Sequence, residues 1–159
     1  MQIYNVKIPQ FTLGSALTAF GTIIAGATRS FLLLEMDFQG RGTASADNEL
    51  AVCRVGTAGT TGGTALTFTP VDSPNMTGTT PALAFSGTGF GSYATQPLTG
   101  AVAHNVPLNS NGQRYFWRAN PNLNNAIVVP GGNNAAASIA LFPVTGTGSV
   151  GGRLQLAEL

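Results

Sequence analysis

His104 and Cys53 are the only histidine and cysteine in the 159-residue chain, so a nucleophilic active site with a histidine base would have to use His104, and Cys53 is the one thiol that could pair with it. Such a site needs a base beside its nucleophile and an acid to orient the imidazole. His104 lies in the extended stretch 101–106, where a structural hydrogen bond is the ordinary role of a histidine. Cys53 follows residues 50–52 and has the pattern of a small buried hydrophobe. We therefore expect no enzymatic activity.

Carboxylates and metal ligands give no stronger signal. Glu35 and Asp37 are two residues apart in an extended segment, so they share a face, as a pair of catalytic acids would. Charges on the solvated face of a sheet explain them more simply. A zinc site needs three or four His or Cys ligands, and two exist. Asp47, Asn48 and Glu49 offer oxygen ligands but lack the spacing of a calcium loop, so we expect no metal or cofactor.

The glycine-rich run at residues 146–151 has the spacing of a dinucleotide-binding loop. That loop works because it opens a helix whose N-terminus faces the pyrophosphate. Here a strand pattern follows and the chain ends eight residues later. The run therefore predicts a turn.

The composition favours a protein that spends its life assembled with partners. Charged residues make up 8% of the chain, against about 25% in ordinary globular proteins, and the net charge is +1. With so small a net charge, electrostatic repulsion between copies of the chain, or between the chain and a partner, is weak. The seven Lys and Arg residues are scattered, and Arg114 and Arg118 are interpreted as solvated strand residues, so no nucleic-acid partner is expected. No apolar run is long enough for a membrane span.

Residues 113–130 predict two strands joined by a turn, a hairpin around which we expect the fold to be organised. Side chains alternate across an extended chain, so one face is bulky and the other is charged. The bulky face carries Gln113, Tyr115 and Trp117, and the charged face carries Arg114, Phe116 and Arg118. An Asn- and Pro-rich segment supplies the turn, and residues 127–129 resume a β-branched run.

Period-two patterns punctuated by Gly, Pro and Asn predict eight to ten short strands and no clear helix. A short helix starting near Asp47 is the alternative to a strand there. The fold class is all-β, an antiparallel two-sheet β-sandwich, jelly-roll-like, with an extended N-terminal arm at residues 1–27 and the sandwich domain at 28–159. The expected strands include residues 3–8, 30–38, 49–55, 65–69, 82–85, 101–108, 138–144 and a last one around Leu154 and Leu156.

The last third of the chain, FWRANPNLNNAIVVPGGNNAAASIALFPVTGTGSVGGRLQLAEL, resembles the C-terminal pattern of small structural proteins of tailed bacteriophages. An aromatic-Arg strand, a polar turn, a Val-Pro strand, a Gly-Asn turn and a final pair of strands recur in that family. The resemblance implies a non-enzymatic decoration or cement protein on the outer surface of the virion capsid, made in the host cytoplasm. Its implied partner is the major capsid protein, and it implies a homo-oligomer, with a trimer favoured.

Such a protein must touch its neighbours, and extended arms or edge strands suit this role. We expect the arm and the loops at 56–64 and 86–100 to make these contacts. A receptor-binding or carbohydrate-binding module of a phage tail tip, using the loop aromatics, is the alternative function. The candidate partner-contact residues are Ile3, Tyr4, Phe11, Phe90 and Tyr93.

Overall fold

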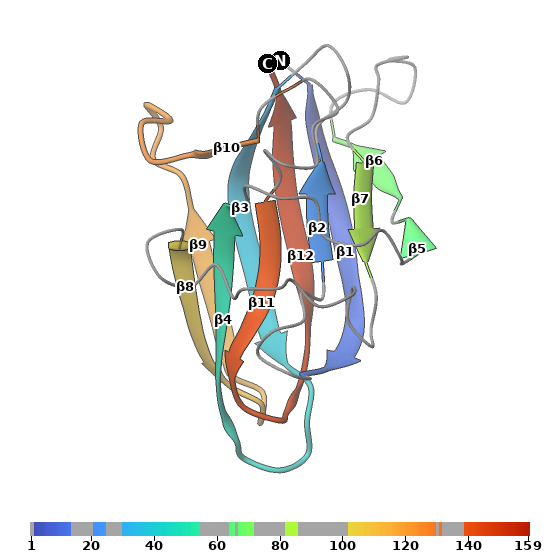
Figure 1. Ribbon diagram of the computed structural model, residues 1–159, viewed down its shortest axis with the longest axis vertical. Coiled ribbons are helices and arrows are strands. Elements are labelled where there is room, and N and C mark those ends of the chain that lie inside the picture. Colours follow the sequence, from blue (N-terminus) through green and yellow to red (C-terminus); the bar gives the residue numbers. More distant parts are fainter. Residues whose placement is uncertain are drawn as a thin grey trace.

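The part of the chain described by the computed structural model contains twelve strands and no helix. The strands form two antiparallel sheets packed face to face, which confirms the predicted all-β sandwich (Figure 1). The two ends of the chain lie side by side, because Glu158 N donates to Gln2 O at 2.8 Å. The described residues are 2–13, 21–24, 30–54, 64–65, 67–71, 82–85, 102–129, 131 and 139–159, with the backbone alone at 22–24, 64–65, 82–85 and 102.

Each sheet is built from strands far apart in the sequence. The first sheet contains, in spatial order, β10 (Ile127–Val129) and β9 (Arg114–Arg118) along one edge of β3 (Phe31–Gly40), then β12 (Ser149–Glu158), β1 (Ile3–Thr12) and β6 (Phe68–Pro70). The second contains β5 (Thr64–Ala65), β7 (Ala82–Phe85), β2 (Gly21–Ile24), β11 (Ile139–Thr145), β4 (Asp47–Arg54) and β8 (Val102–Asn109). The helix considered near Asp47 is wrong, since β4 begins there.

Alternating side chains from the inner faces of both sheets form the core. In β12, Leu154 and Leu156 are buried in this core, while Arg153 and Gln155, which alternate with them, face outward. Val6 and Ile8 of β1 follow the same rule. Burial of each such side chain contributes about 1.5–3 kcal/mol, so the alternation fixes which side chains of β1 and β12 face the core.

The N-terminal segment belongs to the sheets wherever it is described. β1 pairs with β12 on one side and β6 on the other, and β2 pairs with β11 and β7. Over these residues the expected arm at 1–27 is part of the sheets. β12 pairs with residues 3–8 and with Phe11 and Thr12, whereas β6 pairs with residues 4–6 alone. Residues 14–20 and 25–27 and the loop expected at 86–100 lie outside the described residues, as does the loop expected at 56–64 except for Thr64, which begins β5.

The predicted hairpin at residues 113–130 is wrong. Both of its strands exist, but β9 and β10 each pair with β3 and lie one after the other along it. The chain leaves β3 after Arg118 and returns at Ile127, in a loop closed by its own hydrogen bonds, such as that from Leu123 N to Asn120 O at 2.9 Å. Leu123 has a left-handed φ of 58°. The Asn-rich segment makes a turn as expected, but the turn returns the chain to the strand that it left.

Two further turns cross from one sheet to the other. Residues 110–113 join β8 to β9, and residues 146–148 join β11 to β12. The glycine-rich run at 146–151 is therefore a turn followed by a strand, as predicted. Gly146 has a φ of +102°, and a side chain on Gly148 would collide with Ser110 Cβ. These glycines allow the two crossings to pack together at one end of the sandwich.

Candidate functional site: an arginine-rich face of the first sheet

The outer face of the first sheet gathers ionic side chains from four adjacent strands, β9, β3, β12 and β1, and from Arg41 just after β3. Outward positions alternate with core positions along β3, β9 and β12, so the register brings their charged residues together. We call this surface the arginine face. It comprises Lys7, Glu35, Asp37, Gln39, Arg41, Arg114, Phe116, Arg118 and Arg153.

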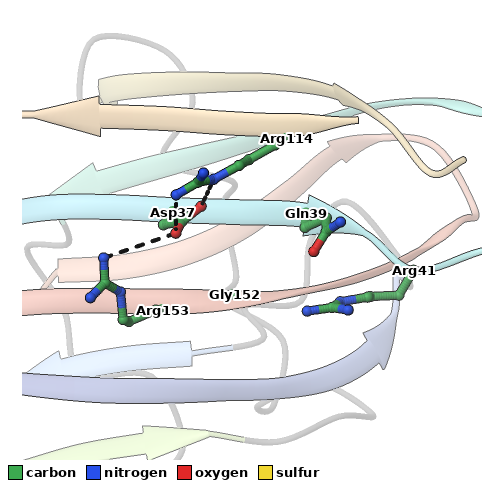
Figure 2. Close-up of a pocket in the computed structure, with 6 residues that line it drawn as sticks. All are labelled: Asp37, Gln39, Arg41, Arg114, Gly152 and Arg153. Carbon is green, nitrogen blue, oxygen red and sulfur yellow. Dashed lines mark hydrogen bonds and ion pairs between the residues drawn. The ribbon is translucent and has the colours of Figure 1, made fainter. Parts of the chain in front are cut away.

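Asp37 lies between two arginines (Figure 2). Arg114 donates from Nε to Oδ1 at 2.7 Å and from Nη2 to Oδ2 at 2.8 Å, a two-pronged contact, while Arg153 Nη2 lies 4.0 Å from Oδ2. The hydrogen bonds from Arg114 lower the pKa of Asp37; partial burial opposes them, and the charges of both arginines add to them. The same pairing raises the pKa of Arg114. Asp37 is therefore an ionised carboxylate fixed in place.

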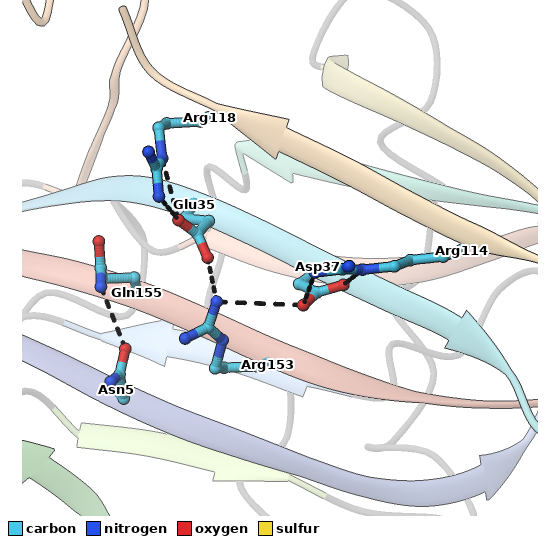
Figure 3. Close-up of polar contacts among 7 residues, drawn as sticks. All are labelled: Asn5, Glu35, Asp37, Arg114, Arg118, Arg153 and Gln155. Atoms are coloured by element: carbon cyan, nitrogen blue, oxygen red, sulfur yellow. Dashed lines mark hydrogen bonds and ion pairs between the residues drawn. The ribbon is translucent and has the colours of Figure 1, made fainter. Parts of the chain in front are cut away.

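Glu35 is a buried carboxylate that also binds two arginines (Figure 3). Its side chain is 1% exposed. Arg118 donates to Oε2 from Nη2 at 2.7 Å and from Nε at 3.0 Å, and Arg153 Nη2 donates to Oε1. Arg153 therefore links the two acids. The result is a chain of five alternating charges, in which each guanidinium has a defined position.

Phe116 is an exposed aromatic ring between two cations. Its side chain is 47% exposed, and the guanidinium carbons of Arg114 and Arg118 lie 5.5 and 5.6 Å from the ring centre. These distances allow cation–π contacts on both sides. Phe116 thus presents a large apolar surface to solvent beside two positively charged side chains.

The arginine face is strongly positive for so weakly charged a chain. Five of the six Lys and Arg residues that the structure describes belong to it, with two carboxylates, a net of three positive charges. The sixth, Arg54, lies in the second sheet and donates to Val128 O at 2.9 Å. The arrangement suits recognition of an acidic or anionic surface, because guanidinium groups bind carboxylates and phosphates in a fork geometry.

The three candidate contact residues that the structure describes, Ile3, Tyr4 and Phe11, do not gather into a site. Tyr4 and Phe11 are buried core residues of β1, and the Tyr4 hydroxyl donates to Gln2 Oε1 at 2.8 Å. Ile3 is half-buried against a small outer cluster with Leu32. Phe90 and Tyr93 lie outside the described residues.

His104 and Cys53 point to opposite faces of the second sheet and cannot form a dyad. His104 pairs with Val52, whose side chain is in the core, so the neighbouring Cys53 points outward. Burial raises the pKa of the Cys53 thiol to about 11, so it is protonated. His104 Nε2 instead shares a 2.5 Å hydrogen bond with the Tyr115 hydroxyl, and its ring centre lies 5.2 Å from that of Trp117. The imidazole joins the second sheet to β9 of the first.

The free energy of unfolding should fall when the pH drops from 7 to 5. Burial lowers the pKa of His104 below its ordinary value of 6.5, so in this range the unfolded chain binds more protons than the folded one. The stability is complete above about pH 6.5 and is lost as the pH falls through the lowered pKa. Urea unfolding at pH 7, 6 and 5 measures this slope. His104→Gln removes the only histidine and should flatten it; an equal slope in that variant contradicts the assignment.

Sequence reasoning singled out five members of the arginine face, Glu35, Asp37, Arg114, Phe116 and Arg118, but did not predict that they lie together. Glu35 and Asp37 were expected on a solvated sheet surface, and Arg114 and Arg118 as independent solvated residues. The structure corrects this for Glu35, which is buried under the arginines that it binds. The available signal was the even spacing, which puts each pair on one face of its strand: the acids are two residues apart and the arginines are four apart.

Among the residues that the structure describes, no three His, Cys, Asp or Glu side chains gather where they could hold a metal ion. The same residues contain no helix long and apolar enough to cross a membrane.

Comparisons of the chain with protein-family models, curated proteins and solved structures gave no match.

Proposed function

We propose that this chain is a non-enzymatic structural protein of a tailed-phage virion, which decorates the capsid and cements neighbouring major capsid subunits. The resemblance of the last third of the chain to such proteins motivates the proposal. The observation that carries it is the arginine face, where ordered guanidinium groups surround the exposed ring of Phe116. Arginine and aromatic side chains are those most enriched among residues that dominate binding energy at protein interfaces.

The geometry explains how such a face would hold a partner. Phe116 offers apolar area for burial, and Arg114 and Arg118 beside it can bind carboxylates of an acidic shell surface. Because their ion pairs already hold the guanidinium groups in place, binding orders few side chains. A protein that holds two shell subunits at once reinforces each contact by the other.

The sheet edges support the proposed homo-oligomer, with a trimer favoured. In the spatial order of the described strands, β6 and β9–β10 are the edges of the first sheet, and β5 and β8 are those of the second. An edge strand has unpaired backbone donors and acceptors that can add a neighbour's strand. The proposed location is the outer surface of the capsid.

Phe116→Ser should weaken binding to empty expanded capsids by about tenfold or more, since it removes the central apolar contact. Co-sedimentation with capsids of the phage that encodes this chain measures the affinity. Val71→Ser is the matched control, because Val71 is exposed to a similar degree, 49% against 47%, but follows β6 at the opposite edge. The control should bind like the unchanged protein.

Two results would contradict the proposal. Failure of the unchanged protein to bind capsids would remove the cement role, and equal binding by both variants would remove the arginine face from it. A glycan-array screen tests the tail-tip alternative, which an exposed Phe116 ring also permits. Saccharide binding without capsid binding would favour that alternative.

A further inference from the structure

A hollow of about 380 Å³ opens on the arginine face beside the end of β3. Figure 2 shows Arg41 extending over β12 toward Arg153, with Gln39 and Asp37 above them on β3. Three guanidinium groups therefore surround one open space. Its lining residues are Asp37, Gln39, Arg41, Arg114, Gly152 and Arg153.

The floor of the hollow is nearly bare backbone. Gly151 and Gly152 follow one another in β12, and Gly151 pairs with Gln39 of β3. A Cβ atom on Gly151 would lie 3.6 Å from Arg41 Cγ, so the stem of Arg41 lies against this glycine. Gly151 thus has no side chain on the outer face, which leaves the backbone of β12 open beside the stem of Arg41. Gly152 faces the core instead, where a Cβ atom would meet Phe38 Cδ1 at 2.8 Å.

The charge lining the hollow is unbalanced. Asp37 is the one carboxylate among three guanidinium groups, and it already binds Arg114 through both oxygens. Arg153 is oriented by Glu35 and Asp37. Arg41 forms no ion pair with any acid that the structure describes. Glu35 thus offsets part of the charge of Arg153, and Arg41 carries the one guanidinium around the space that no described carboxylate binds.

We propose that this hollow binds a compact oxyanion of the phosphate class, held between Arg41 and Arg153 with the Gln39 amide as a further donor. An anion with three or four oxygens can accept hydrogen bonds from several guanidinium groups at once, whereas a carboxylate has only two oxygens. Asp37 and Glu35 hold Arg114 and Arg153 in place before the anion arrives, which reduces the entropy lost on binding. The proposal does not depend on the virion role.

Titration calorimetry with inorganic phosphate, at constant ionic strength set with sodium chloride, tests the site. Saturable binding is expected, and Arg41→Gln should weaken it by about tenfold or more, as loss of a charge-assisted contact does. Arg54→Gln is the matched control, because it removes the same charge from the second sheet. It should bind phosphate normally. Both substitutions are at exposed residues, and thermal unfolding checks that both variants fold.

Further titrations identify the anion. If a phosphate monoester binds at least as tightly as inorganic phosphate, the site is assigned to an esterified phosphate. If the monoester binds more weakly, the site is assigned to the free anion. Either result supports the proposal. Glutarate binding as tight as phosphate overturns the phosphate class. No saturable phosphate binding, or equal weakening by Arg54→Gln, overturns the site itself.

Discussion

Gly40→Ala should lower the free energy of unfolding by about 3 kcal/mol or more, because the new methyl group would overlap with backbone atoms of the neighbouring turn. Its Cβ would meet Asn109 O and Ser110 C, with Ser110 O at 2.5 Å, and all three are backbone atoms. The turn that carries them is fixed. Ser110 N donates to Ala46 O at 2.9 Å, and Ser110 O accepts from Gly42 N at 2.8 Å. Relief of the clash would break these bonds.

Gly112→Ala is the matched control in the same turn. Gly112 has a φ of +77°, but nothing lies within 4 Å of the position that its new Cβ atom would take, so only the cost of the left-handed backbone remains. That cost is about 1–2 kcal/mol. Urea unfolding of both variants measures the difference. A loss for Gly40→Ala no larger than that for Gly112→Ala would mean that the turn can move away from β3.

The sequence predicts the strands well because burial imposes a local pattern. Leu154 and Leu156 face inward and Arg153 outward, as alternation requires, and Tyr115 and Trp117 lie opposite Arg114 and Arg118 as expected. Such patterns need no knowledge of the neighbouring strand. They failed for the hairpin at 113–130, because an Asn-rich turn and two apolar runs look the same whether the strands pair with each other or with a third strand.

The arginine face could not be predicted for a related reason. Arg114 and Asp37 are 77 residues apart in the sequence, Arg118 and Glu35 are 83 apart, and Arg153 and Glu35 are 118 apart. Only the register of β3 with β9 and β12 brings them together. Register depends on the packing of the whole sandwich, so a scan of the sequence sees scattered arginines.

The double variant Arg118→Gln/Arg153→Gln should lose about 3 kcal/mol of stability, because it leaves the buried carboxylate of Glu35 without the two cations that bind it. The arginine side chains are 67% and 41% exposed, so solvent screening keeps the loss toward the low end for a buried pair. Arg118→Gln alone should cost less, since Arg153 still donates to Glu35.

Adding Glu35→Gln to the double variant should recover more than half of the loss. A neutral amide of the same shape is far less costly to bury than an ion without a partner. Urea unfolding of the double and triple variants at pH 7 and low salt measures the recovery. A triple variant no more stable than the double would mean that the arginines stabilise the sheet through packing of their aliphatic stems over β3, because restoring charge balance would then restore nothing.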